Sequence, residues 1–345
     1  MRPPILAVLF TFIAAAPARS MQNNVGTAAA EFLRLGAGAR SLGMGEAYSA
    51  VAEGPDAAYW NPAGLARMSR PEAIYARSEL PAGLHHDHLA VGVPCGFLSG
   101  TVAVAVTRLS QEDLALVDAS NQQLGSFAPH SEVYALAYGR RFSDSDADSM
   151  DPRRDYFRRA NIPHVERPYV DEREPWTGEV AAGLSLKMIS ENLGTRSAST
   201  FAVDGGGLFR PEDLHELILA GAFRHVGGKI KLISESNPLP GELAASVAYD
   251  ARVDGLRLLP AFEAVAPYAG NPYGKVGIEA ERAVGAGFSA AARFGFSSRA
   301  VPDLGVLAGL TAGVGLRAAS FGFDAAFQPM SLLGESFRLG VGWRF

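Results

Sequence analysis

The sequence predicts an all-β protein: a 14-stranded antiparallel transmembrane β-barrel with an N-terminal, partly helical segment in its lumen. Three observations predict this class. Apolar and polar residues alternate with period two through most of the chain. Many of the alternating segments are near the roughly 9 to 11 residues that a tilted strand needs to cross a bilayer. Beyond residue 20 no apolar run is long enough for a membrane-spanning helix.

Composition excludes several classes of protein. The chain has 345 residues, a formal net charge of −5 and one cysteine, Cys95. The negative balance gives no basic field for nucleic acid, and a lone cysteine provides neither a disulfide framework nor a C-x-x-C pair. Since 48% of the residues are hydrophobic and no helix-length apolar run exists, the apolar residues must be arranged in another way.

Residues 1–20 are expected to be a secretory signal peptide. They begin with Arg2, continue through an apolar run over 5–16 and end in small residues around Ala18. That run is too short to span a membrane. The alternative is a buried N-terminal helix. No cysteine follows the cleavage region, so a lipid anchor there is not expected.

The alternation is clearest at the C-terminus, where the odd positions from 337 to 345 are apolar and the even positions are Ser, Arg or Gly. The same pattern predicts strands near 72–79, 86–94, 97–108, 131–142, 177–192, 198–206, 215–224, 242–251, 257–266, 273–283, 286–296, 306–318, 320–328 and 336–345. A soluble β-sandwich shares this alternation, but its strands are usually shorter. The barrel, over residues 72–345, is therefore favoured, with its apolar face toward lipid.

Connection lengths give an orientation. If the C-terminus is periplasmic, short turns fall on that side at 94–97, 252–256, 283–286 and 318–320. Longer connections fall outside, at 109–130, 225–241 and 297–305.

One connection breaks this asymmetry, at residues 143–176. It carries nine acidic residues, six Arg and four Pro and is assigned to the periplasmic side. A solvated insertion with a short central helix is the expected structure. A docking site for a periplasmic partner is the alternative.

Residues 21–71 do not alternate and are expected to form a separate segment in the lumen. Thr27 is predicted to cap a helix through Leu35, and Asn61 to cap a helix that begins at Pro62. The glycines near residue 40 do not match a dinucleotide-binding loop, because no strand precedes them and the third glycine is missing. Abundant Gly and Ala let backbones pass closely, which favours a place inside the barrel.

The stretch GARSLGMGEAYSAVAEGPDAAYWNPAGLA, residues 38–66, resembles the N-terminal segment of the PorV/PorQ family, a branch of the FadL-like outer-membrane barrels. Residues 224–250 and 339–345 are similar to later parts of the same pattern, whereas the 143–176 insertion departs from it. The resemblance implies an outer-membrane barrel whose N-terminal segment is a hatch, with NPA at 61–63 as the family's motif. The hatch residues that it implies are Gly36, Gly38, Gly43, Gly45, Asn61, Pro62, Ala63 and Gly64.

The terminal Phe345, which ends an alternating strand, looks like the signal by which the outer-membrane assembly machinery recognises its substrates. That machinery and the lipids of the outer membrane are therefore expected partners. An aromatic residue at the membrane interface explains Phe345 equally well.

No catalytic motif of the G-x-S-x-G, H-E-x-x-H or Walker type is found, so the chain is not expected to be an enzyme or to hold a metal or cofactor. The HHDH run at 85–88 offers at most two ligands, His86 and His88, on one strand face. A polar outer-loop end is the favoured explanation. Charged residues expected to face the lumen, where they hold the hatch or line a charge-selective path, are Glu279, Glu281, Arg293, Arg317, Asp324 and Arg338.

Two functions remain. The first is a FadL-like barrel that passes hydrophobic small molecules across or into the bacterial outer membrane through a hatch-gated lumen. A lateral gate in residues 97–108 is unproven, because Gly100 is the only weak point there. The alternative is a PorV-like component of a type IX secretion system that shuttles or tethers secreted proteins. The cargo is accordingly a hydrophobic ligand or a secreted protein, and no nucleic acid is expected to bind.

Overall fold

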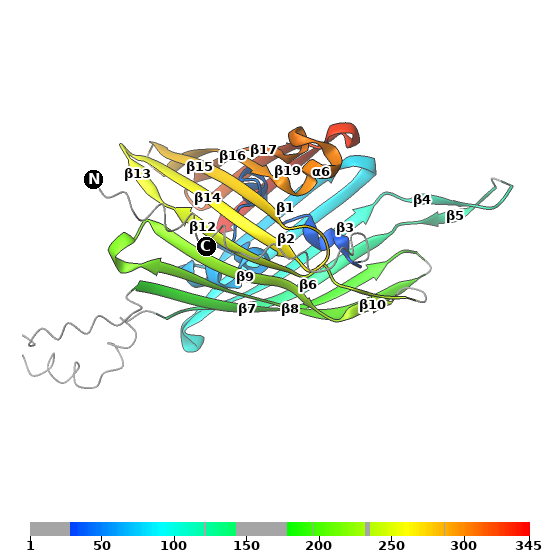
Figure 1. The fold of residues 1–345 in the computed structure, drawn as a ribbon, viewed down its shortest axis with the longest axis horizontal. Coiled ribbons are helices and arrows are strands. Elements are labelled where there is room, and N and C mark those ends of the chain that lie inside the picture. The colour runs from blue at the N-terminus through cyan, green and yellow to red at the C-terminus, as the bar shows by residue number, and fades with distance from the viewer. Residues whose placement is uncertain (1–27, 121, 143–177, 195, 232–234, 286) are drawn as a thin grey trace, which may run out of the picture.

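The computed structural model describes residues 28–120, 122–142, 178–194, 196–231, 235–285 and 287–345. The predicted signal peptide, the predicted cap at Thr27 and the 143–176 insertion lie outside these residues. Two parts are described: a barrel of strands, and a luminal segment, residues 28–71, that precedes it in the chain (Figure 1).

Fourteen strands form the barrel, as the alternation predicts. They are β1 (Glu72–Leu80), β2 (Leu84–Cys95), β3 (Gly100–Gln111), β6 (His130–Phe142), β7 (Gly178–Asn192), β8 (Ser197–Pro211), β9 (Leu217–Gly227), β12 (Glu242–Tyr249), β14 (Leu256–Pro267), β15 (Tyr273–Gly285), β16 (Phe288–Ser297), β17 (Leu310–Ala318), β18 (Phe321–Pro329) and β19 (Glu335–Arg344).

Each of these strands pairs antiparallel with its neighbours in chain order, and β1 pairs with β19 to close the ring. The short strand β13 (Ala251–Val253) extends the β12–β14 pairing, and two hairpins lie outside the ring: β4 (Leu114–Val117) with β5 (Gln123–Phe127), and β10 (Lys229–Lys231) with β11 (Ser236–Pro238). Closure satisfies the backbone groups that a sheet edge would leave unpaired in hydrocarbon. The predicted fold class is confirmed.

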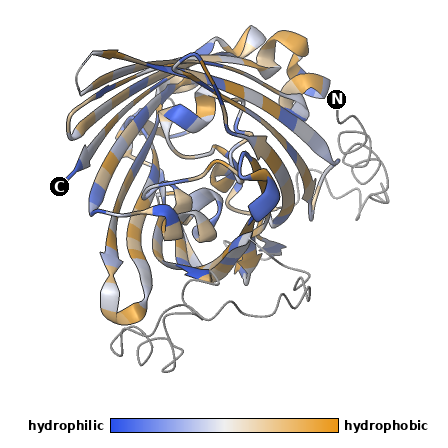
Figure 2. Ribbon diagram, turned by 90° about the vertical axis from the view of Figure 1, so that its left-hand side faces the viewer, coloured by the Kyte–Doolittle hydropathy of each residue, from blue (hydrophilic) through white to orange (hydrophobic). Residues whose placement is uncertain are grey.

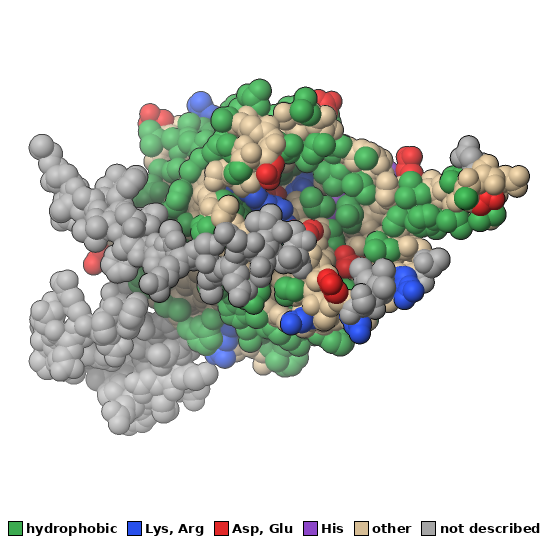
Figure 3. Space-filling model, turned by 45° about the vertical axis from the view of Figure 1, so that its right-hand side comes forward, with side chains coloured by type: hydrophobic (Ala, Val, Ile, Leu, Met, Phe, Trp, Pro, Cys, Tyr) green, Lys and Arg blue, Asp and Glu red, His purple; other side chains and the backbone are tan. Residues whose placement is uncertain are grey.

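The two faces of each strand have opposite character. On β19 the side chains of Leu339 and Trp343 are 64% and 48% exposed, whereas that of Arg338 is 3% exposed. On β16 the same contrast separates Phe294 from Arg293. Hydrophobic side chains cover the outer wall, and charged ones gather in the opening (Figure 3). The apolar face therefore points outward, as a lipid-facing barrel requires.

The longest described connections lie at the end opposite the C-terminus. One of them, between β3 and β6, carries the projecting β4–β5 hairpin (Figure 1). Short turns at 96–99, 212–216 and 319–320 lie at the other end, which is therefore the periplasmic end. Short helices in the connections are η3 (Pro81–Gly83), η4 (Gly96–Leu98), η5 (Glu212–Leu214), η6 (Ser298–Ala300), α6 (Val301–Leu304), η7 (Val306–Gly309) and η8 (Ser331–Leu333).

The luminal segment is enclosed by the ring of strands (Figure 2). Its helices are η1 (Glu31–Arg34), α2 (Ala39–Gly43), α3 (Ala57–Trp60) and η2 (Pro62–Arg67). In the described part of the chain no helix has the length and hydropathy needed to cross a membrane. The main hydrophobic core lies between this segment and small wall side chains such as Ala90 and Ala103.

The helix predicted from Thr27 through Leu35 is wrong where the structure describes it: residues 28–35 contain only one 3₁₀ turn, η1. Ala30, which precedes the turn, has a left-handed backbone with φ of 54°. The backbone N–H of Ala29 donates to the carbonyl of Pro238 (2.9 Å). The chain before η1 therefore contacts the β10–β11 hairpin, and the left-handed Ala30 interrupts any helix at this point.

Candidate functional site

Asn61 ties the luminal segment to the barrel wall. It caps η2, as predicted: its Oδ1 accepts a hydrogen bond from the backbone N–H of Ala63 (3.1 Å). Its Nδ2 donates to the carbonyl oxygens of Ser49 (3.0 Å) and Gly207 (3.3 Å). The side chain is fully buried, so one amide joins two turns of the segment and strand β8.

A row of three glycines lies under the NPA motif. Gly139 of β6 pairs with Gly183 of β7, which pairs with Gly206 of β8. A β-carbon at Gly183 would lie 2.5 Å from the backbone nitrogen of Ala63, and one at Gly206 would lie 2.1 Å from Asn61 Oδ1. The segment therefore contacts the wall backbone directly, which only glycine permits.

A second contact of this kind lies on β15, β16 and β17. Gly277, Gly295 and Gly313 face the turn Gly43 to Gly45. A β-carbon at Gly295 would lie 2.0 Å from the nitrogen of Gly45, which has a φ of +62°. The N–H of Gly45 also donates to Thr311 Oγ1 (3.0 Å). These strands are nearly opposite β7 in the ring, so the segment is held at both sides of the lumen.

Other predicted hatch residues lie within the segment itself. Gly36 and Gly38 have positive φ values of 67° and 85°, and the N–H of Gly36 donates to Tyr59 Oη (3.1 Å). A β-carbon at Gly64 would lie 2.3 Å from the carbonyl oxygen of Ala52. These glycines allow the segment to fold tightly on itself.

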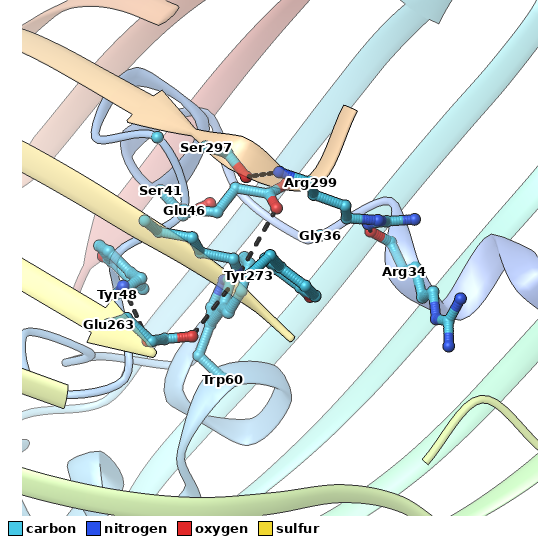
Figure 4. Close-up of polar contacts among 12 residues, drawn as sticks. Arg34, Gly36, Ser41, Glu46, Tyr48, Trp60, Glu263, Tyr273, Ser297 and Arg299 are labelled. Carbon is cyan, nitrogen blue, oxygen red and sulfur yellow. Dashed lines mark hydrogen bonds and ion pairs between the residues drawn. The ribbon is translucent and has the colours of Figure 1, made fainter. Parts of the chain in front are cut away.

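Arg224 is the centre of a buried ion-pair network that the sequence analysis missed. Its Nε lies 2.6 Å from Glu242 Oε1 and its Nη2 lies 3.1 Å from Glu263 Oε1. Its Nη1 donates to the carbonyl of Trp60 (3.1 Å). Glu263 accepts from the backbone N–H of Tyr48 (3.2 Å; Figure 4). The sequence did contain a signal for this network, because Arg224, Glu242 and Glu263 are charged residues within three predicted strands.

A second network joins four of the predicted lumen-facing residues. Glu279 pairs with Arg293 (2.6 Å) and with Arg40 of the luminal segment (2.7 Å). Asp324 pairs with Arg293 (2.8 Å) and Arg317 (2.9 Å). Each buried charge thus has an opposite partner, which offsets the cost of removing it from water.

The two remaining predicted residues also face the lumen. Glu281 accepts a hydrogen bond from Ser289 Oγ (2.6 Å). Arg338 donates to Ser78 Oγ (2.6 Å) and to the carbonyl of Leu35 in the luminal segment (2.8 Å). The side chain of Arg338 therefore holds the luminal segment by a hydrogen bond to the segment's backbone and not by an ion pair.

A polar cavity of about 310 Å³ lies against the second network, toward the periplasmic end. Glu53 of the luminal segment lines it beside Arg40. Burial acts to raise the pKa of Glu53, but Arg40 and Arg257 outweigh this and hold it at about 2. The charged residues that line the cavity are Arg40, Glu53, Arg257, Glu279, Glu281, Arg293, Arg317 and Arg344.

The HHDH run lies at the outer end of β2, as expected, and His85 pairs there with Glu79 (2.6 Å), but two of its histidines are not part of a polar loop end. His86 and His88 face the lumen and are 2% and 1% exposed, because the strand turns this face inward. His88 Nε2 lies 3.7 Å from Asp56 Oδ1 of the luminal segment. Burial raises the pKa of Asp56 to about 7. Among the described residues no group of side chains is arranged to hold a metal.

An apolar cluster lies at the outer end of the lumen. Phe32 and Leu33 of η1 are buried there in a cluster with Val133, Ile189 and Ala202 of the wall. We call these three wall residues the outer socket. The outer socket is thus an apolar site beside η1, although Arg299 also reaches η1 at this end, and the network of Glu279 and Arg293 lies deeper, toward the periplasm.

A closed barrel with a lipid-facing exterior, a charged interior and a segment across its lumen defines a transmembrane β-barrel of the outer-membrane type. This fold agrees with the predicted place in a bacterial outer membrane. No protein-family model and no curated protein matches the sequence.

Solved structures do match. The toluene transporter TbuX of Ralstonia pickettii has 12% sequence identity and a TM-score of 0.52, over 90% of this chain and 98% of that one. The toluene transporter TodX of P. putida has 9% identity and a TM-score of 0.52, over 90% and 99%. A Pseudomonas aeruginosa FadL homologue has 11% identity and a TM-score of 0.47, over 89% and 98%. The shared feature is the fold.

Proposed function

We propose that this protein passes hydrophobic small molecules across or into the outer membrane and that the luminal segment acts as a hatch. The observation that carries this proposal is the outer socket. Phe32 and Leu33 close the outer end of the lumen with apolar contacts, whereas ion pairs dominate the layers below. A solute that arrives from outside therefore meets an apolar site first.

An apolar solute can replace the side chains that fill the socket. Burial of one large apolar side chain contributes roughly 1.5–3 kcal/mol, and a solute of similar surface recovers that free energy when it takes the same place. A polar solute recovers none. Two toluene transporters share this fold, at 12% and 9% sequence identity, and this supports a hydrophobic small molecule as the solute.

Polar contacts hold η1 at few points, which favours its exchange for a solute. The carbonyl of Leu33 accepts from Tyr59 Oη, Arg34 Nη2 donates to the carbonyl of Ala269 (2.9 Å), and Arg299 Nη1 donates to the carbonyl of Arg34 (2.5 Å). The deeper part of the segment has the glycine contacts and both ion-pair networks. We infer that the outer turn yields first and that the deeper part moves in a second step.

The test is entry of radiolabelled toluene and of a radiolabelled disaccharide into cells that express the barrel. The double variant Phe32→Ser/Leu33→Ser should change toluene entry several-fold and leave disaccharide entry low. Leu332→Ser is the matched control, because Leu332 is 99% exposed and lies outside the socket. Equal toluene entry in cells with and without the protein would refute the proposal.

The resemblance of residues 38–66 to the PorV/PorQ family carries a second proposal, a component of a type IX secretion system. Crosslinking in the native cell separates the two. A secreted protein captured on the barrel, with no effect of the socket variant on toluene entry, would favour secretion.

A further inference from the structure

The outer wall contains an apolar hollow of about 690 Å³ across β6, β7, β8, β9 and β12. Its floor is made of small residues that face away from the lumen: Ala182, Gly205, Gly207 and Gly221. Its sides are the larger outward residues Tyr138, Leu184, Phe223 and Leu243. The volume is within the roughly 300–1,000 Å³ of sites that hold small ligands.

The glycines of the floor are not explained by contacts with the luminal segment. Gly206, between them in sequence, faces Asn61 on the inner side. By contrast, a β-carbon at Gly207 would have no neighbour nearer than 3.7 Å, and one at Gly221 none nearer than 4.0 Å. Glycine weakens a strand interior. At these two positions it leaves space on the lipid side instead of relieving a clash.

A cation lies at the periplasmic rim of the hollow. Arg140 belongs to β6, two residues before the strand ends, and lines the hollow with its guanidinium 5.3 Å from the ring of Phe142. Its Nε is buried without a hydrogen-bond partner, and Arg140 forms no ion pair with any residue that the structure describes. A buried donor of this kind calls for an acceptor, and a cation calls for an anion.

We propose that the hollow binds an anionic phospholipid, with one acyl chain on the glycine floor and the phosphate on Arg140. The hollow opens toward hydrocarbon, so its occupant is apolar over most of its length. Arg140 lies at the interfacial level, where a lipid phosphate is found. Both chemical requirements are met by one molecule. The site rests on the barrel and its lipid-facing side, and it does not depend on the proposed transport.

Native mass spectrometry of the barrel released from nanodiscs tests the site. The nanodiscs contain equal amounts of phosphatidylethanolamine and phosphatidylglycerol. The wild-type barrel should retain one phospholipid, enriched in phosphatidylglycerol. Gly221→Leu fills the hollow and should reduce retention about tenfold. Ala292→Leu adds the same side chain to the lipid face of β16 and should retain lipid as the wild type does.

The variant Arg140→Gln distinguishes binding of the lipid headgroup from binding of the acyl chain. It should keep the acyl chain bound and lose the enrichment in phosphatidylglycerol. Each variant is first shown to be folded by its heat-dependent migration in a detergent gel. Equal retention by Gly221→Leu and Ala292→Leu would overturn the proposal, and so would a wild-type barrel that carries no phospholipid or carries a second copy of the chain in its place.

Discussion

Asn61 and Gly206 share a space that admits no further atom. The carboxamide oxygen of Asn61 lies where a β-carbon on residue 206 would come within 2.1 Å of it. The Nδ2 of the same amide donates to the carbonyl of Gly207, which belongs to strand β8 of the wall. The position of the luminal segment is therefore set by the absence of a side chain in β8.

Gly206→Ala should loosen the luminal segment. The added methyl group displaces Asn61, and overpacking of this kind costs about 1–3 kcal/mol. Gly207→Ala is the control, because its β-carbon would meet Ala181 only at an ordinary 3.7 Å. Limited proteolysis of residues 28–71 measures the difference. Equal cleavage of the two variants would show that the contact does not hold the segment.

Asn61→Ala should also release the segment, through lost hydrogen bonds. It removes the η2 cap, worth about 1 kcal/mol, and leaves the carbonyls of Ser49 and Gly207 without their donor. Asn61→Ser keeps an oxygen for the cap and should lose less. Hydrogen exchange of the Ala63 amide, compared among the three proteins, follows the cap directly. Unchanged protection in Asn61→Ala would contradict this expectation.

Glu279→Ala should destabilise the barrel strongly. Arg40 and Arg293 would each lose one of two carboxylate partners and keep Glu53 and Asp324 respectively. Breaking a buried pair costs about 3–5 kcal/mol when the charge is left alone, so the remaining partners should hold the cost near the lower end. Glu281 is two residues away on the same strand and is less buried. Glu281→Ala should cost far less, and urea unfolding in lipid vesicles compares the two. Similar unfolding midpoints would contradict the assigned role of the network.

Docking of the luminal segment should weaken as pH rises toward neutrality. Because burial raises the pKa of Asp56 from an ordinary 3.8 to about 7, the docked state favours the protonated acid. Protonated Asp56 therefore contributes its full stabilisation of the docked state below about pH 4. This contribution is lost progressively as the pH rises to about 7. Proteolysis of the segment by a protease active over this range should be faster at pH 8 than at pH 5.

Asp56→Asn is the control for that pH dependence. The amide cannot ionise, so the rate should no longer depend on pH through this residue. A steep dependence that persists in Asp56→Asn would assign the effect to another group.

Local pattern sufficed for the barrel. The last strand was expected over 336–345 and spans Glu335–Arg344, because alternation is a property of adjacent residues. The Asn61 cap was equally local. The structure before Leu35 could not be predicted from local sequence, since the backbone N–H of Ala29 donates to Pro238, more than two hundred residues away.

The contacts of the lumen depend on strand register, which alternation does not determine. Gly139, Gly183 and Gly206 form a row only because their strands pair at those positions. Arg224 and Glu263 likewise belong to strands whose polar faces were predicted, although nothing local indicates that they meet. His86 and His88 were expected at a polar outer-loop end, and nothing local indicates that they are buried in the lumen.

The glycine row also bears on how fast the luminal segment can leave. A wall without protruding side chains has nothing to interlock with, so the segment can slide along it without rotamer changes in the strands. Friction against the barrel is therefore low at this surface. Retention of the segment at this wall therefore depends on directed polar contacts, such as those of Asn61, and not on interlocked side chains.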